Sequence, residues 1–273
     1  MQWVAILVTR CVPSKWRTRL YSWILKRIPA PHFGAMRCRR IAPGIYLKTA
    51  ACCVAEAATL RMVARYTSIP VPQILDVVPS AQPGMWHLLM TELPGDNLMS
   101  VWKSLDENQR YDVALQLREW VDQLRGIPSP YGNAICAPGR SSFMCIRADE
   151  DDPIGPFDSI SDFHVFLTRI FLLTQLVTPP LAEPLRIARA REPYIRFTHG
   201  DLKTHNLMFN QGKLSGIIDW ESSGWLPDYW EFTSAHWPFR RDRENPWHIC
   251  VGLALDHYPN DLEAEAVLRA AQY

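Results

Sequence analysis

The segment 196–225 constrains what this chain can fold into more than any other part of the sequence. It contains two short apolar runs, 207–210 and 213–219, that are separated only by Gln211 and Gly212. A glycine in a two-residue gap supplies the positive φ angle that a tight hairpin turn needs. The segment therefore predicts a β-hairpin that turns at these two residues.

Three polar side chains are expected at one end of this hairpin. Asn206 lies about opposite Ile217, give or take one or two residues, so Asn206 and Asp219 share that end. Asp201 lies in the loop that leads into the hairpin, and its carboxylate can reach the same end. Mg²⁺ takes one or two carboxylates and keeps several waters. The set therefore suits phosphoryl transfer from a nucleotide, with Asn206 and Asp219 as metal ligands and Asp201 orienting the acceptor hydroxyl and accepting its proton.

The motifs around these residues resemble the aminoglycoside phosphotransferase-like kinases, especially their fungal subgroup. His-Gly-Asp-Leu-Lys-Thr-His-Asn at 199–206 and Ile-Asp-Trp-Glu at 218–221 carry the resemblance. It implies an α+β, protein-kinase-like fold with two lobes, and ATP and Mg²⁺ as cofactors. It also implies that Asp201 is catalytic and that Asn206 and Asp219 bind magnesium, Asp219 being the counterpart of the DFG aspartate of kinases.

The N-terminal part of the chain carries further matching residues. A short predicted strand ends at Lys48, and Glu56 opens a predicted helix, 55–66. Gly-Ile-Tyr-Leu-Lys, Glu-Ala-x-x-Leu-Arg and Tyr-Thr-Ser-Ile-Pro-Val-Pro again resemble the family. The resemblance implies that Lys48 binds the nucleotide phosphates and that Glu56 positions it. As isolated residues they would form a surface ion pair worth less than about 1 kcal/mol.

Upstream of Lys48 the sequence departs from this pattern. Neither Gly-x-Gly-x-x-Gly nor Gly-x-x-x-x-Gly-Lys-Ser/Thr precedes it, and only about twenty residues separate it from Pro29. We expect an abbreviated N-terminal lobe, too short for a full pair of strands with a phosphate-covering loop. This departure favours weak or absent turnover and keeps open a second function, that of a nucleotide-binding or regulatory pseudokinase.

Strands are predicted at 70–78 and 85–91, on either side of a Pro79–Gly84 turn. The following Glu92 and Leu93 resemble a hinge between lobes, where backbone groups would bind adenine; a plain connector is the equal alternative. The predicted organisation is a basic N-terminal extension with an amphipathic helix (1–40), an N-terminal lobe with hinge (41–95), and a mainly helical C-terminal lobe (96–273).

The C-terminal lobe is predicted from helical periodicity. A core helix, with a capping box formed by Ser104 and Glu107, runs to Leu124, and further helices are expected at 161–176, 227–236, 246–256 and 261–271. The segment 129–160 is predicted to be irregular, with a solvated acidic run at 149–152. Three tryptophans near the site favour core packing over the floor of an acceptor pocket because of their large apolar area: Trp225, Trp230 and Trp237.

Several side chains near the motifs are given structural roles. An imidazole hydrogen-bonded to backbone is favoured for His199 over a catalytic one. Lys203 and His205 are expected to be exposed loop residues, and Asp228 and Glu231 are candidates to brace the loop. A zinc cluster of His199, Asp201 and His205 is disfavoured because no further ligand group is evident. A protein kinase is also disfavoured, since His-Gly-Asp replaces His-Arg-Asp and no Ala-Pro-Glu follows.

The basic residues are concentrated near the N-terminus, in and around a predicted amphipathic helix. The chain has 29 basic and 28 acidic residues, but ten of the basic and none of the acidic residues lie in the first 55. The predicted helix 14–28, with Ser14 as a cap, puts Trp16, Leu20, Trp23 and Ile24 on one side. A helix docked on the protein surface is favoured over a mitochondrial targeting segment or a helix on an anionic membrane.

Other partners are not expected. A net charge of +1 gives no reason to expect nucleic acid. The apolar run 3–8 is far shorter than the roughly 20 residues that span a bilayer, so no integral membrane segment is expected. Seven cysteines without a Cys-x-x-Cys pair indicate reduced thiols and a cytoplasmic protein. The sequence thus predicts an ATP- and magnesium-dependent phosphotransferase that acts on the hydroxyl of a small-molecule acceptor.

Overall fold

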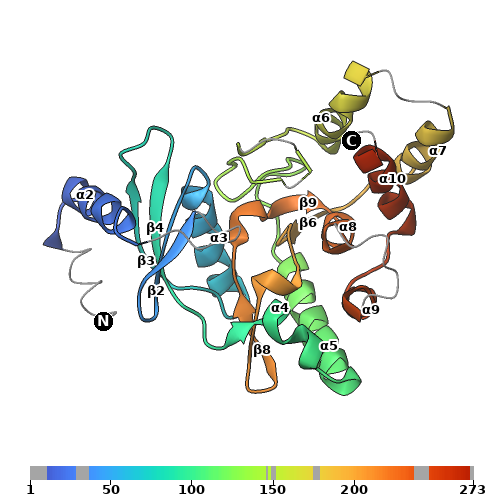
Figure 1. The fold of residues 1–273 in the computed structure, drawn as a ribbon. Helices are drawn as coiled ribbons and strands as arrows, with labels where there is room; N and C mark the ends of the chain where they lie inside the picture. Colours follow the sequence, from blue (N-terminus) through green and yellow to red (C-terminus); the bar gives the residue numbers. More distant parts are fainter. Residues whose placement is uncertain are drawn as a thin grey trace.

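Alternating apolar residues in the N-terminal part build a four-stranded antiparallel sheet. Its strands, in spatial order, are β1 (Cys38–Ala42), β2 (Ile45–Ala50), β4 (Trp86–Thr91) and β3 (Ile74–Pro79). The computed structural model describes residues 11–28, 37–145, 147–148, 152–174, 179–236 and 246–270. Helix α2 (Ser14–Leu25) covers one face of the sheet and helix α3 (Cys53–Tyr66) the other (Figure 1). This arrangement brings Lys48 of β2 and Glu56 of α3 together on the face of the sheet that α3 covers.

The predicted strands of this lobe are present. The 70–78 strand is β3, which begins only at Ile74, and the 85–91 strand is β4. The helix predicted at 55–66 is α3. Among the described residues, β1 is the only strand ahead of the one that carries Lys48, which agrees with an abbreviated sheet. The segment 29–36 lies outside the described residues.

The chain leaves the sheet after β4 and enters a largely helical lobe. Strand β5 (Asp96–Asn97) leads into α4 (Leu98–Val101), η1 (Trp102–Ser104) and the long helix α5 (Glu107–Arg125). The cap of α5 differs from the prediction. Asp106 accepts from the Gln109 N–H at 2.9 Å, and the Gln109 side chain accepts from the Asp106 N–H at 2.9 Å. The capping box therefore starts two residues later than the Ser104 and Glu107 pair.

The predicted hairpin is confirmed. Strands β7 (Leu207–Asn210) and β8 (Lys213–Ile217) are antiparallel and join β5 in a three-stranded sheet. Leu207 pairs with Ile217, one residue away from the expected register, because a bulge lies between Met208 and Phe209. A second ribbon, β6 (Ile195–Thr198) with β9 (Gly224–Pro227), flanks the hairpin. The 199–206 loop, which ends in η2 (Thr204–Asn206), lies between the two ribbons in sequence.

The remaining helices lie on the side of the lobe that is away from the N-terminal sheet (Figure 1). They are α6 (Ile160–Thr174), α7 (Pro179–Arg189), α8 (Trp230–His236), α9 (Pro246–Ala254) and α10 (Pro259–Ala270), with the short η3 (Trp220–Ser222) after the hairpin. The helix expected at 227–236 begins only at Trp230, because Pro227 ends β9. Helix α7 was not predicted. No helix in the described part of the chain has both the length and the apolar character needed to cross a membrane.

Trp225, Trp230 and parts of the irregular segment lie in the hydrophobic core. Trp225 and Trp230 are each 2 % exposed, which confirms core packing for both, whereas Trp237 lies outside the described residues. The 129–160 segment is irregular as predicted, but isolated bridges such as Phe143 to Ile154 tie its described part together. Residues 1–10, with the apolar run at 3–8, and residues 149–151 of the acidic run lie outside the described part.

Helix α2 docks only partly through the predicted side. Tyr21 is buried and Ile24 of the predicted side packs beside it, whereas Trp16 and Trp23 are 60 % and 53 % exposed. The Tyr21 hydroxyl donates to Asp76 of β3 at 2.7 Å, and Arg17 forms an ion pair with the same carboxylate. Ser14 makes no capping bond, since Pro13 stands at the N-cap. These polar contacts and the apolar packing of Tyr21 against Leu47, Val78 and Leu89 fix the orientation of this helix.

Candidate active site

A glycine allows the 199–206 loop to pass close to the chain after the hairpin. Gly200 has a φ angle of +82°, and a Cβ atom there would lie 2.2 Å from the carbonyl oxygen of Ser222. Any other residue would be strained and would collide with backbone. Glycine therefore permits the turn that directs Asp201 toward the end of the hairpin.

A buried carboxylate braces the same loop. Glu231 of α8 is 1 % exposed and accepts from the backbone N–H groups of His199 at 2.6 Å, Gly200 at 3.2 Å and Leu202 at 3.3 Å. Three otherwise orphaned donors are satisfied by one side chain. Asp228, the other candidate brace, instead forms an ion pair with Arg191 at 2.8 Å. The sequence had suggested both acids, and Glu231 is the one that contacts the loop.

His199 has a structural role. It is fully buried, its Nε2 lies 3.0 Å from the carbonyl oxygen of Ile218, and the Asp201 N–H donates to its Nδ1 at 3.3 Å. Because both ring nitrogens are engaged with backbone, neither is available to a metal ion. This geometry confirms the buried imidazole and rules out the zinc cluster of His199, Asp201 and His205.

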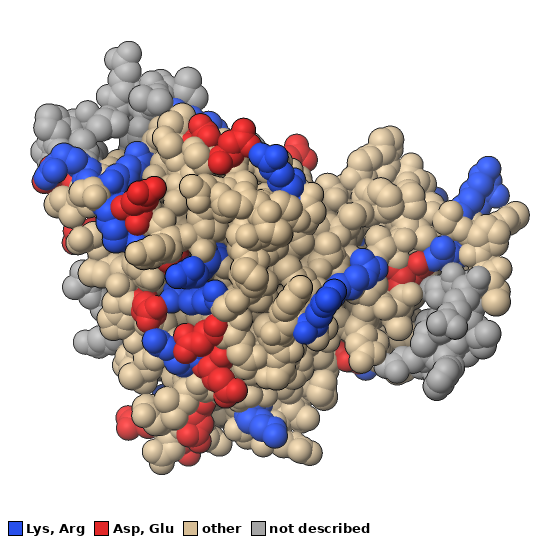
Figure 2. Space-filling view, turned by 180° about the vertical axis from the view of Figure 1, so that it is seen from behind, with Lys and Arg blue, Asp and Glu red and all other residues tan. Residues whose placement is uncertain are grey.

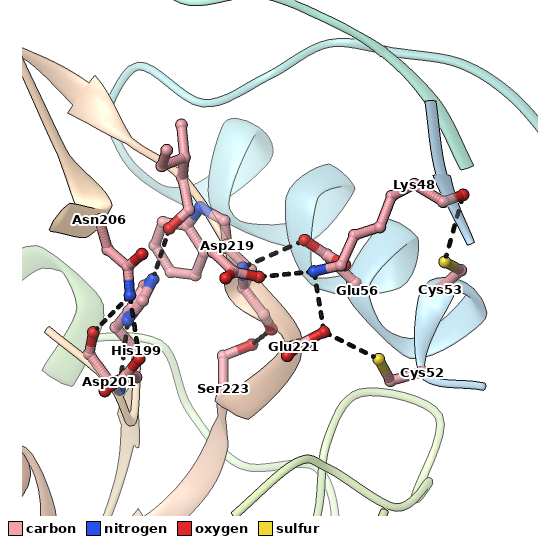
Figure 3. A network of polar contacts seen from close by, with 12 residues as sticks. Lys48, Cys52, Cys53, Glu56, His199, Asp201, Asn206, Asp219, Glu221 and Ser223 are labelled. Carbon is pink, nitrogen blue, oxygen red and sulfur yellow. Dashed lines mark hydrogen bonds and ion pairs between the residues drawn. The ribbon is translucent and has the colours of Figure 1, made fainter. Parts of the chain in front are cut away.

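Asp201, Asn206 and Asp219 are brought together at the end of the hairpin (Figure 3). The Asn206 side-chain nitrogen donates to the Asp201 carbonyl oxygen at 2.8 Å and to the Asp201 carboxylate at 3.1 Å. The Asn206 carbonyl oxygen accepts from the Ile218 N–H at 2.9 Å, which holds Asn206 beside the strand end that carries Asp219. Asp219 itself has a φ angle of +63°, a left-handed conformation that aspartate tolerates better than most residues.

Lys203 departs from its predicted exposure. It is 7 % exposed and forms an ion pair with Asp201, and His205 Nε2 lies 3.6 Å from the same carboxylate. Burial alone would raise the pKa of Asp201, but the hydrogen bond from His205 and the charge of Lys203 outweigh it and lower the pKa to about 2. Asp201 is therefore ionised throughout the neutral range and already has one cationic neighbour, Lys203.

Lys48 lies at the centre of a group of carboxylates. Its ammonium nitrogen is 2.8 Å from Glu56, 2.5 Å from Asp219 and 2.9 Å from Glu221 (Figure 3). Lys48 and Glu56 are 4 % and 1 % exposed, so the pair is not the surface contact considered for isolated residues. Burial alone would lower the pKa of Lys48, but Asp219, Glu56 and Glu221 outweigh it and raise the pKa well above its usual range.

Three carboxylates around one ammonium leave negative charge in excess. This excess affects Glu56. Burial and the charge of Asp219 raise the pKa of Glu56, Lys48 lowers it, and the net result is a pKa of about 7. Partial loss of solvent would raise the pKa of Asp219, but the charge of Lys48 outweighs this and lowers the pKa below its usual range, so Asp219 stays ionised. A divalent cation next to Asp219 would balance this excess charge, so the donor set fits Mg²⁺.

A small cavity opens onto these acids. Its volume is about 140 Å³, and it is lined by Met144, Cys145, Ala148, Asp201, Asp219, Glu221 and Ser222. The Asp219 side chain is 43 % exposed toward this space. By contrast, Lys48 and Asp219 are in direct contact, so the structure leaves no nucleotide-sized gap between them. Nucleotide phosphates would have to replace this contact.

The wall of the cavity is held from behind by a buried arginine. Arg147 forms an ion pair with Glu265 of α10 at 3.1 Å and donates to the side chains of Thr233 at 2.8 Å and Ser234 at 2.9 Å. Its guanidinium carbon lies 3.5 Å from the ring centroid of Trp230. The segment that carries the apolar wall is thereby tied to α8 and α10.

The two hinge candidates differ in their surroundings. The Glu92 N–H donates to the carbonyl oxygen of Gly44 at 3.0 Å, and its carboxylate pairs with Arg40 at 2.8 Å. Leu93 is 9 % exposed and packs near Gly216 of the hairpin. The Glu92 side chain and N–H are thus engaged within the protein.

Comparison with known proteins places the chain in a family. Residues 16–249 match the model of the phosphotransferase enzyme family. The chain belongs to this family. A comparison with curated protein sequences finds no match.

Solved structures share the fold at low sequence identity. The GDP complex of wild-type aminoglycoside 2'-phosphotransferase-IIIa is 14 % identical, with 94 % of this chain and 90 % of that chain covered and a TM-score of 0.60. Aminoglycoside-3'-phosphotransferase of type VIII is 16 % identical, with coverages of 92 % and 97 % and a TM-score of 0.55. A GDP and kanamycin complex, of APH(2")-IIia, is 15 % identical, with coverages of 94 % and 90 % and a TM-score of 0.54. These similarities confirm the kinase-like α+β fold with its N-terminal sheet and helical C-terminal lobe.

Proposed function

We propose that this chain transfers the γ-phosphoryl group of ATP to a hydroxyl group of a small molecule, with magnesium bound. The observation that carries the proposal is that the Asp201 and Asp219 carboxylates line one cavity, with Asn206 hydrogen-bonded to Asp201. The resemblance of the 199–206 and 218–221 motifs to the fungal subgroup of the family belongs to the same proposal.

Each residue has a chemical task in this proposal. The Asp201 carboxylate orients the acceptor hydroxyl and accepts its proton as the new bond forms. Lys48 turns its ammonium from Asp219 to the nucleotide phosphates, and Glu56 holds Lys48 while it does so. The Leu93 backbone N–H hydrogen-bonds to the adenine base of the nucleotide, since the Glu92 N–H already donates to the carbonyl oxygen of Gly44. Met144 and Ala148 form an apolar wall beside the Asp201 and Asp219 carboxylates.

Magnesium would be held by Asp219 and by the side-chain oxygen of Asn206, whose nitrogen is engaged with Asp201. Bound there, the ion would neutralise charge on the phosphate oxygens. Its presence would also offset the negative charge that Lys48 alone does not balance among its three carboxylates.

The acceptor is proposed only by chemical class. The similar structures include a complex with kanamycin, a small polyhydroxylated amine, but their sequence identity supports the fold and not the substrate. The carboxylates that line the cavity would favour an acceptor with cationic groups near its hydroxyl. The compartment remains the cytoplasmic one expected from the sequence.

A pseudokinase is the second candidate, and the Lys48 to Asp219 contact favours it. A lysine held by three carboxylates opposes the entry of phosphates, in agreement with the absence of a glycine-rich motif ahead of Lys48. Such a protein would bind nucleotide without turnover.

One experiment separates these candidates. The chain is incubated with labelled ATP and Mg²⁺ and a panel of hydroxyl compounds that includes aminoglycosides, and thermal stabilisation by Mg-ATP is measured in parallel. Phosphate transfer that Asp201→Asn abolishes supports the kinase. Stabilisation without transfer supports the pseudokinase, and absence of both rejects the two proposals together.

A further inference from the structure

Helix α2 presents an aromatic stripe to solvent. Trp16, Leu20 and Trp23 follow one another at helical spacing and are 60 %, 40 % and 53 % exposed. The opposite side of the helix is fixed to the sheet by the Tyr21 and Arg17 contacts with Asp76. The stripe therefore cannot turn inward without breaking these buried contacts.

Basic side chains border this stripe. Lys15, Arg19, Lys26 and Arg27 are all exposed, and the sequence contains no acidic residue before Glu56. In Figure 2 the α2 end of the molecule lies at the right, where Lys and Arg side chains project from a largely uncharged surface.

Two of these cations contact the aromatic rings. The Arg19 guanidinium carbon lies 5.2 Å from the ring centroid of Trp16, and that of Arg27 lies 3.8 Å from the ring centroid of Trp23. Aromatic rings and cations that share one helix side are typical of helices lying at a lipid headgroup layer, where the rings enter the interface and the cations meet acidic headgroups.

We propose that α2 binds this chain peripherally to anionic lipid bilayers. Tryptophan rings would enter the headgroup region, and the four cations would attract phosphatidylserine or similar lipids. A second copy of the chain is a poorer occupant, because it would bring the same four positive charges against one another. A soluble polyanion would use the cations but would gain little from the apolar stripe on a convex helix.

The test is flotation of the full-length chain with lipid vesicles. One set contains phosphatidylcholine with about one-third phosphatidylserine, and the other contains phosphatidylcholine alone. The proposal predicts binding to the first set only, weakened by salt. The double variant W16S/W23S should bind at least about tenfold more weakly. Each exposed cation contributes roughly fivefold, so K15Q/R19Q/K26Q should lose on the order of 100-fold.

A matched control removes two exposed aromatics that also have arginine neighbours elsewhere. Tyr66 and Tyr194 are 56 % and 68 % exposed and lie beside Arg65 and Arg196. The Y66S/Y194S variant should bind vesicles like the parent chain, and all variants should keep the parent's thermal midpoint.

Several results would overturn the proposal. They are absence of binding to the anionic vesicles, equal binding to both vesicle sets, unchanged binding by W16S/W23S, and loss of binding in the Y66S/Y194S control. If binding is absent and analytical ultracentrifugation finds a dimer that W16S/W23S dissociates, the stripe is instead an interface between two copies of the chain. None of these readouts depends on phosphate transfer, so the outcome is independent of the proposed function.

Discussion

Replacement of Glu231 tests how the site is held together. Glu231→Ala leaves the three N–H groups of His199, Gly200 and Leu202 without an acceptor in a buried place. Each unsatisfied buried donor costs about 1–3 kcal/mol, and water that enters the space left by the side chain reduces this cost. The expected loss in the free energy of unfolding is therefore about 3 kcal/mol.

A milder variant and a control sharpen this prediction. Glu231→Gln keeps one acceptor oxygen and turns the other into an amino group that faces N–H donors, so it should lose about 2 kcal/mol. Glu263→Gln, at an exposed site on α10, should stay within about 0.5 kcal/mol of the parent. Urea denaturation measures these differences.

Activity should fall with the two Glu231 variants and not with Glu263→Gln. Because Glu231 sets the backbone from which Asp201 projects, a small displacement of the loop should lower kcat at least about tenfold with a smaller effect on the KM for ATP. If Glu231→Ala unfolds less than 1 kcal/mol more easily than the parent, or transfers phosphate at the parent rate, the bracing role is refuted.

The remaining predictions concern charge. Lys48→Met should lower kcat/KM for ATP at least about 100-fold. It should also destabilise the chain more at pH 8 than at pH 5, because at pH 8 Glu56 and its neighbouring carboxylates are charged and have no cation beside them. Equal destabilisation at both pH values would contradict the role of Lys48 in balancing these charges. The pKa of Asp201 is lowered from 3.8 to about 2, so its ionised form stabilises the fold by roughly 2 kcal/mol above pH 4. This stabilisation is lost as the pH falls toward 2. In Asp201→Asn, the free energy of unfolding should therefore depend less on pH between 4 and 2 than in the parent. Burial lowers the pKa of His87 below 6.5, so the stability that depends on neutral His87 is complete above that pH and declines below it. Thermal midpoints of the parent and His87→Gln should therefore converge as the pH falls from 7 to 5, and parallel curves would refute this.

The hairpin and its polar end could be predicted because the signals are local. A glycine-containing gap between two apolar runs fixes the turn, and the turn fixes which residues share an end. Three strands of the N-terminal sheet, β2, β3 and β4, and the main helices were predicted for the same reason, whereas β1 was not predicted. The register error of one residue comes from a bulge opposite Met208 and Phe209, where Ser215 has no partner. The local sign of this bulge is Gly216, whose φ angle is +151°, and the prediction did not use it.

Other features depend on contacts between distant parts of the chain. Lys203 was expected to be exposed because a charged loop residue usually is, but its buried partner Asp201 makes burial tolerable. The predicted docking side of α2 was wrong for most of its residues, because helical periodicity does not tell which side packs on the protein. The contact that decides it joins Tyr21 to Asp76, 55 residues away in sequence. Likewise, nothing near Glu221 in sequence indicates that it reaches Lys48.

The central claim is that Asp201 acts on the acceptor whereas Asp219 serves the metal and the nucleotide. The most direct measurement compares Mg-ATP binding, by calorimetry, with phosphate transfer in the parent, Asp201→Asn and Asp219→Asn. The account predicts that Asp201→Asn binds Mg-ATP like the parent but transfers no phosphate, and that Asp219→Asn loses both. Phosphate transfer by Asp201→Asn at the parent rate would contradict it.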